Sequence, residues 1–234
     1  NTHLVAREAC RLISQRNKDK PLFLYVPFNG VHAPHQVPDS YLAPYSHLKG
    51  ARRKYAGMLA AVDEAIGQIV DALDAAGITD QTLIAFSSDN GGPAPRTVTD
   101  NGELRAGKGT IYEGGVRSCA FVRWPGKVPA GIIIREPMHM IDWYPTLIRL
   151  AGGALDQKLP IDGRDVWPMM TRGEKSPHEA ILSVQSPGRA AVRVGDWKLL
   201  MNAGKPDAEE DTEATKPQRR NRQRASEADQ FELY

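Results

Sequence analysis

A long amphipathic segment between two short apolar runs constrains the fold of this chain more than any other feature. The first run covers residues 22–26 and the second covers residues 82–86, and turn residues follow both. Runs of this length beside turn residues are typical of buried β-strands. The segment between them predicts a helix, and Gly77 follows it where a C-terminal cap is expected. The apolar positions of this helix are Tyr55, Met58, Leu59, Val62, Ile66, Ile69, Val70 and Leu73.

The order strand, helix, strand predicts an α/β fold. Such a crossover joins parallel strands and places the helix on one face of the sheet. Residues 1–16 are expected to form another helix, the second half of one that begins earlier. Residues 117–122 are expected to add a strand, and residues 143–150 a helix for which Asp142 is the N-cap.

The last part of the chain predicts an antiparallel arrangement instead. Residues 191–201 have the pattern of a hairpin that turns at Gly195 and Asp196. A turn-rich stretch precedes them and marks a boundary. We therefore divide the chain into residues 1–173, the α/β part, and residues 174–234, a small β subdomain.

Residues 203–230 differ in kind from the rest of the chain. An acidic block at residues 207–213 precedes a block with four arginines, and alanine is the main apolar residue there. Such a composition buries too little surface to fold alone, so we predict a disordered, solvated loop rather than an arm that binds a polyanion. Residues 231–234 resume a strand pattern, and the polypeptide is expected to continue beyond them.

Charge and hydropathy argue against two classes of partner. The net charge is only +2 over 234 residues, which does not favour a nucleic-acid partner. No apolar run approaches the length that crosses a membrane. Cys10 and Cys119 have no metal-ligand spacing and can form at most one disulfide, so they do not define a redox compartment.

Polar residues at the end of the second apolar run form the first candidate site. Asp89 and Asn90 stand there, followed by Gly91 and Gly92. In open α/β sheets, ligands bind outside the carboxyl ends of the strands. The pair would supply one charged and one neutral oxygen, which are the ligands that Ca²⁺ and Mg²⁺ prefer. The same four residues also suit an ordinary turn, so this motif alone leaves both interpretations open.

Two other loops carry charged or titratable side chains. His32 follows the first apolar run, and Lys108 lies between two glycines, where it can reach an anion as a compact point charge. The spacing around Lys108 is not that of a phosphate-binding P-loop. Each residue alone also suits a structural or solvated role. Together with the strand-end pair they describe a metal-assisted site for an anionic substrate, with a titratable histidine near the leaving group.

Several segments of the sequence resemble the type I sulfatases, and arylsulfatase B-like members in particular. The likeness covers about residues 2–201. It implies part of an alkaline-phosphatase-like α/β/α sandwich, with a small C-terminal antiparallel sheet subdomain. The segments that carry the resemblance, in the order of the family, are residues 21–38, 55–63, 88–92, 104–117, 138–150 and 195–198.

The resemblance implies roles for four residues. Asp89 and Asn90 match the pair that helps to hold the active-site Ca²⁺, with Mg²⁺ as the other candidate ion. Lys108 matches the lysine that contacts the sulfate group. His32 matches the histidine of the His-x-Pro motif, which contacts the sulfate ester and helps to protonate the leaving oxygen. The implied substrate is a sulfated small molecule or glycan, in an aryl or carbohydrate ester.

The sequence departs from the family in one large respect. Sulfatases use a formylglycine made in a Cys/Ser-x-Pro/Ala-x-Arg motif, and neither Cys10 nor Cys119 begins one. The family's N-terminal Asp-Asp metal ligands and its upstream lysine and histidine are also absent. We therefore expect a C-terminal part of a sulfatase that is inactive by itself, with the formylglycine in a preceding segment.

Two alternatives remain at this stage. Phosphodiesterases and phosphonate hydrolases of the same superfamily usually place Asp-His at this strand end because imidazole suits zinc, so Asn90 favours a hard cation. The other alternative is a non-catalytic remnant that binds sulfated glycans. Many family members are exported, which implies a periplasmic, extracellular or lysosomal location.

Overall fold

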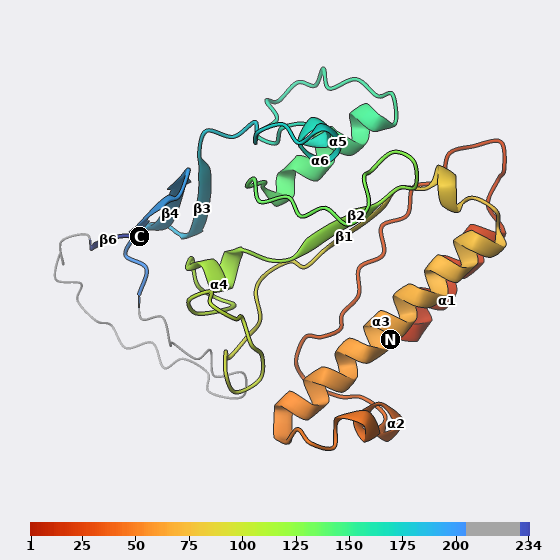
Figure 1. The fold of residues 1–234 in the computed structure, drawn as a ribbon, viewed down its shortest axis with the longest axis horizontal. Helices are drawn as coiled ribbons and strands as arrows, with labels where there is room; N and C mark the ends of the chain where they lie inside the picture. Colours follow the sequence, from red (N-terminus) through yellow and green to blue (C-terminus); the bar gives the residue numbers. More distant parts are fainter. Residues whose placement is uncertain (205–229) are drawn as a thin grey trace.

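The computed structural model describes residues 1–204 and 230–234, and these contain two small β-sheets and several helices (Figure 1). The paired helices lie on one side of the molecule and the four-stranded sheet lies on the opposite side, with the two-stranded sheet between them (Figure 1). Most of the predicted disordered loop, 203–230, falls outside the described residues. No helix in the described ranges is long and apolar enough to cross a membrane.

Two helices pack along each other at the N-terminal end of the chain. They are α1 (Thr2–Ser14) and α3 (Gly50–Ala75), and both were predicted from their apolar spacing. Most of their buried residues have short side chains, which allows the two backbones to approach closely. The Cys10 thiol of α1 reaches the Gln68 carbonyl oxygen of α3 at 3.4 Å. The buried residues are Ala6, Ala9 and Ile13 on α1 and Gly57, Ala61, Val62, Ala65 and Leu73 on α3.

The predicted glycine cap ends α3. Gly77 has φ +65°, a conformation that residues with a Cβ rarely adopt. Its N–H donates to the Asp74 carbonyl oxygen at 2.9 Å, and the Ile78 N–H donates to the Leu73 carbonyl oxygen at 3.1 Å. These two bonds are those of a Schellman motif, which satisfies the last carbonyls of a helix. Two short turns, α2 (Asp39–Leu42) and η1 (Ala43–Tyr45), precede α3, and η2 (Thr79–Gln81) follows it.

The central sheet consists of β1 (Ile84–Ser87) and β2 (Ala120–Arg123), which pair antiparallel. The rings of Phe86 and Phe121 face each other across the pair, with centroids 4.4 Å apart. The Ser88 N–H extends the pairing by donating to the Cys119 carbonyl oxygen at 3.0 Å. The carboxyl end of β1 is therefore held beside the start of β2.

The prediction of a strand at residues 22–26, parallel to β1, is wrong for the described residues. This segment is extended, but it makes no sheet ladder within the described ranges. Its side chains still alternate, since Phe23 and Tyr25 are 76% and 81% exposed while Leu24 and Val26 are half-buried. A strand needs a neighbour that accepts its backbone hydrogen bonds, and an apolar run cannot reveal whether that neighbour is present.

A buried aspartate organises the helical layer formed by η3 (Met140–Asp142), α5 (Trp143–Leu150) and α6 (Trp167–Arg172). Asp142 is the N-cap of α5, as predicted, but its carboxylate makes no capping bond to α5. It accepts instead from the backbone N–H groups of His139, at 2.7 Å, and Arg164, at 2.8 Å. The His178 Nε2 also lies 2.9 Å from it. One carboxylate thus joins three separate segments.

The C-terminal sheet has the strand order β3-β4-β5-β6, and its pairs are all antiparallel. Its strands are β3 (Ile181–Ser186), β4 (Arg189–Val194), β5 (Trp197–Met201) and β6 (Phe231–Leu233). The predicted hairpin is confirmed, since Val194 pairs with Trp197 across the two turn residues. Beyond β5, the Asn202 N–H donates to the Gln230 carbonyl oxygen at 2.7 Å.

The C-terminal sheet packs on the loop that precedes α4 (Glu113–Val116). Ile111 and Tyr112 from this loop share a buried cluster with Ala191, Leu200 and Ala203. The division predicted at residue 173 falls between the two sheets, both of which are antiparallel, and apolar contact joins the C-terminal sheet to the first part of the chain.

We expect Asp142→Ala to lower the free energy of unfolding strongly. The change removes the acceptor of two backbone N–H groups, and each buried donor left unpaired costs about 1–3 kcal/mol. Urea denaturation followed by circular dichroism measures the loss. The control is Asp156→Ala in an exposed loop, which should stay within about 0.5 kcal/mol of the parent protein. Equal stability of the two variants would contradict the assigned role of Asp142.

Candidate active site

The carboxyl end of β1 presents two side-chain oxygen donors. Asp89 is exposed, and within the described ranges its carboxylate makes no hydrogen bond or ion pair. The amide of Asn90 donates to the Gly91 carbonyl oxygen at 3.2 Å, which leaves its own oxygen available. The Ser88 hydroxyl fixes the turn by donating to the Asn90 carbonyl oxygen at 2.9 Å. The local structure is therefore a turn, as one interpretation held, and it also offers two oxygens to a cation.

Backbone contacts at glycines hold this turn against the Lys108 loop. A Cβ at Gly91 would lie 1.7 Å from the Gly114 carbonyl oxygen, and one at Gly107 would lie 2.3 Å from the Gly92 carbonyl oxygen. Real Cβ atoms do not approach so closely, so only glycine fits at these positions. The Lys108 N–H then donates to the Gly92 carbonyl oxygen at 3.1 Å. Two sequence-distant loops are joined here through their main chains.

Asn101 connects the same loops, and it was not identified from the sequence. Its side-chain oxygen accepts from the Gly92 N–H at 3.1 Å. Its amide donates to the carbonyl oxygens of Gly92, at 3.1 Å, and Ala106, at 2.8 Å, and lies 3.4 Å from that of Gly114. The only signal in the sequence was the turn-like Asp-Asn-Gly triplet that contains it, and such triplets are common in ordinary turns.

The structure brings His32 and Lys108 together, although 76 positions separate them in the sequence. The Lys108 Nζ lies 2.7 Å from the His32 Nε2. The His32 Nδ1 lies 2.7 Å from the Ala33 carbonyl oxygen, which can only accept, so Nδ1 carries the proton. Nε2 is then the acceptor of the ammonium group. The pair presents one positive charge and one imidazole nitrogen at an exposed position.

A second histidine, also missed from the sequence, stands close to this pair. The ring of His35 meets the ring of Tyr55 edge-on, with centroids 5.8 Å apart. Burial lowers the pKa of His35, and electrostatic interaction with His32 and Lys54 lowers it further. Burial raises the pKa of Tyr55, and electrostatic interaction with Cys119 and Asp89 raises it further. The electrostatic coupling connects the His32 loop, α3 and the end of β1.

Asp89 and Asn90 fit part of a site for a hard cation. Their free donors are oxygens, which suit Ca²⁺ or Mg²⁺ better than a transition metal. In the described ranges, this site included, no group of three or more His, Cys, Asp or Glu side chains could hold a metal ion. Since Ca²⁺ takes six to eight oxygen ligands, these two residues could supply only some of them.

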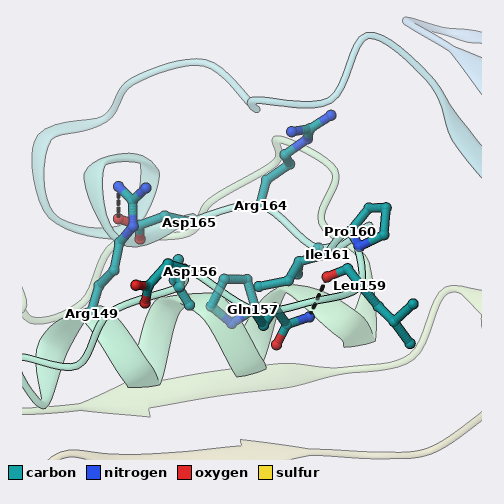
Figure 2. Close-up of a pocket in the computed structure, with 11 residues that line it drawn as sticks. Arg149, Asp156, Gln157, Leu159, Pro160, Ile161, Arg164 and Asp165 are labelled. Atoms are coloured by element: carbon teal, nitrogen blue, oxygen red, sulfur yellow. Dashed lines mark hydrogen bonds and ion pairs between the residues drawn. The ribbon is translucent and has the colours of Figure 1, made fainter.

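A cavity of about 310 Å³ lies apart from these residues (Figure 2). It is bounded by α5 and by residues 155–165, and it shares no lining residue with the candidate site. Figure 2 shows the ion pair of Arg149 and Asp165 at one end and Leu159 and Pro160 at the other. The two acidic and two basic side chains in its lining balance in charge, so the cavity does not favour an anion.

Comparison with protein families matches residues 1–154 to the Sulfatase family. Arylsulfatase J of Mus musculus is 38% identical over 198 residues, covering 84% of this chain and 33% of the relative. The chain therefore spans about a third of the length of this curated relative.

Solved structures also resemble this chain. The crystal structure of Ps i-CgsB in complex with k-i-k-neocarrahexaose matches with a TM-score of 0.81 and 36% identity, covering 85% of this chain and 45% of the other. The PsFucS1 sulfatase from Pseudoalteromonas sp. matches with a TM-score of 0.77 and 28% identity, covering 89% and 42%. These matches confirm the predicted alkaline-phosphatase-like α/β class with its small C-terminal sheet.

We expect Gly91→Ala to destabilise the protein because its Cβ would displace the Gly114 carbonyl. Overpacking of this kind typically costs about 1–3 kcal/mol. The matched control is Gly67→Ala in α3, where a Cβ meets nothing within 4 Å and should stabilise by up to about 1 kcal/mol. Thermal unfolding of both variants distinguishes them, and a Gly91→Ala protein as stable as its parent would refute the assigned close contact.

The lowered pKa of His35 predicts a specific loss of stability in acid. The unfolded chain has the ordinary histidine pKa, about 6.5, so below that pH it binds a proton that the folded chain resists. The contribution of neutral, partly buried His35 is thus present above about pH 6.5 and declines as the pH falls through the ordinary value. His35→Phe should reduce the difference in thermal stability between pH 7.5 and pH 5, whereas His47→Phe at an exposed position should leave that difference unchanged.

Proposed function

The chain belongs to the sulfatase family, and we propose that the protein hydrolyses sulfate esters at a site to which His32, Lys108, Asp89 and Asn90 contribute. The contact of His32 with Lys108 is the observation that carries the proposal. It brings an ammonium group and an imidazole side by side, and the main chain of the Lys108 loop is bonded to the strand-end turn. A sulfate ester requires both, since its sulfuryl oxygens are negatively charged and its leaving oxygen needs a proton.

When a substrate binds, Lys108 would donate to a sulfuryl oxygen and give up its contact with the His32 Nε2. Its ammonium group stabilises negative charge that develops in the transition state, and the main-chain contacts of its loop hold it in place before the substrate arrives. The protein then does not have to reorganise during the reaction. This preorganisation is where an electrostatic contact contributes most to the rate.

His32 would act on the leaving oxygen. While Lys108 donates to Nε2, the imidazole is neutral. Once Lys108 turns to the sulfate group, Nε2 no longer accepts from the ammonium and can take a proton from solvent water. The Nδ1–H keeps its bond to the Ala33 carbonyl oxygen and so orients the ring. The protonated Nε2 can then donate to the departing oxygen as a general acid.

Asp89 and Asn90 are the residues of this chain that would hold a Ca²⁺ ion, with Mg²⁺ as the other candidate. When bound, such an ion neutralises charge on the oxygens of the substrate. The family implies a formylglycine nucleophile, but the Cys/Ser-x-Pro/Ala-x-Arg motif does not occur within these 234 residues. We accordingly expect residues 1–234 alone to show no turnover.

The substrate that we propose is a sulfate ester of a carbohydrate or an aryl group. A matched solved structure holds k-i-k-neocarrahexaose, an oligosaccharide, and an arylsulfatase is the similar curated relative. The exposure of His32 and Lys108 suits a large substrate that is bound from solvent. By the same family likeness we propose a periplasmic, extracellular or lysosomal setting.

The test measures hydrolysis of 4-nitrocatechol sulfate by protein expressed from the complete gene. We expect turnover that EDTA abolishes and Ca²⁺ restores. Lys108→Ala and His32→Ala should each lower kcat by about 10²–10³, the usual cost of removing one transition-state stabiliser. Lys127→Ala, at an exposed position in a turn, is the matched control and should retain the full rate.

Two outcomes would overturn the proposal. Zn²⁺-dependent cleavage of bis(4-nitrophenyl) phosphate without sulfatase activity would assign the protein to the phosphodiesterases and phosphonate hydrolases. Binding of sulfated oligosaccharides without cleavage of any sulfate ester would indicate a glycan-binding protein instead.

A further inference from the structure

Three positively charged side chains surround the carboxylate of Glu113, the first residue of α4. The Lys198 Nζ lies 2.7 Å from one Glu113 oxygen, and the side chain of Lys198 is only 9% exposed. The Arg193 guanidinium lies 3.4 Å from the other oxygen, and that of Arg117 lies 3.9 Å from it. Two of these three cations, those at positions 193 and 198, come from adjacent strands of the C-terminal sheet.

The helix that begins at this carboxylate contacts both parts of the candidate site. The Gly91 N–H donates to the Gly115 carbonyl oxygen at 2.9 Å, so α4 holds the turn that carries Asp89 and Asn90. The Gly114 N–H donates to the Arg105 carbonyl oxygen at 2.8 Å, at the start of the loop that carries Lys108.

The C-terminal sheet contacts the Lys108 loop at a second point. The side-chain amide of Gln185, in β3, donates to the Gly109 carbonyl oxygen. The peptide unit just beyond Lys108 is therefore bonded to the same sheet that binds Glu113. A helix of four residues has too little intrinsic stability to keep its place by itself, so its position depends on such contacts.

From these contacts we propose that Lys198 is a positioning residue. It acts through Glu113 and α4 to hold Lys108 and the Asp89–Asn90 turn in fixed positions relative to each other. The proposal rests on the proposed sulfatase function for its catalytic consequence, while its structural consequence is independent of activity. Among the described residues, the Lys198 ammonium group bonds to Glu113 and to none of the four candidate site residues. Its ammonium group is buried against one carboxylate, and removing one member of such a pair leaves the other charge poorly compensated.

The experiment compares Lys198→Met with Lys175→Met in protein from the complete gene. Lys175 makes a Lys–Glu contact of similar length with Glu136, at 2.8 Å, but its side chain is 91% exposed and its partner does not belong to α4. We measure amide hydrogen exchange at Gly91 and Lys108, whose N–H groups bond the turn to α4 and the Lys108 loop to the turn, together with kcat and KM.

We expect Lys198→Met to speed exchange at both amides by at least about tenfold, relative to the amides of α1, and to lower kcat by a similar factor with little change in KM. Lys175→Met should change neither. If Lys198→Met does not fold, Lys198→Gln is tested by the same measurements, because it keeps a donor for Glu113. Intermediate changes in exchange and kcat would support the proposal, and the absence of any change would overturn it.

The proposal and the function on which it rests fail in different ways. Unchanged exchange at Gly91 and Lys108 in an active Lys198→Met protein would overturn the positioning role. A uniform rise in exchange across the whole protein would do the same, because it would indicate a general loss of stability. Faster exchange confined to these loops, in a protein without sulfatase activity, would support the positioning role and refute the function.

Discussion

Contact between main chains, with no side chain between them, is the constraint on which the rest of this site depends. At Gly91 the neighbouring carbonyl of Gly114 occupies the space that any Cβ would need. The turn after β1 and the first residues of α4 therefore lie closer together than any residue other than glycine at position 91 would allow. Since Asp89 and Asn90 precede one of these glycines directly, their position follows from the backbone rather than from side-chain packing.

The charges of the site are distributed according to the same geometry. Lys108 has a histidine nitrogen as its neighbour instead of a carboxylate, so its positive charge stays available for an anion. The carboxylate of Glu113 is fully engaged by cations from the C-terminal sheet. Compensated and uncompensated charges are thereby separated: the ion pairs of Glu113 support α4, whereas Lys108 and Asp89 have no ion-pair partner among the described residues.

The sequence allowed prediction wherever local chemistry decides the structure. The Gly77 cap, the long helix before it and the hairpin at residues 191–201 are set by nearby residues, and all three are confirmed. The strand at residues 22–26 was wrong because pairing depends on a distant neighbour. For the site, the sequence supplied the residue types, whereas the part played by Asn101 arises from main-chain groups that come together only in the folded chain.

The hydrogen bonds that join Asn202 and Gln230 have a consequence for how this sheet tolerates change. The Asn202 N–H donates to the Gln230 carbonyl oxygen, and the Asn202 side-chain oxygen accepts from the Gln230 N–H at 2.8 Å. The chain therefore leaves β5 and enters β6 at nearly the same point. A connection whose two ends already meet can be lengthened at small entropic expense, about 0.6 kcal/mol for each doubling. The bonds between Asn202 and Gln230 therefore hold the ends of β5 and β6 together, and with them the position of Lys198 on β5.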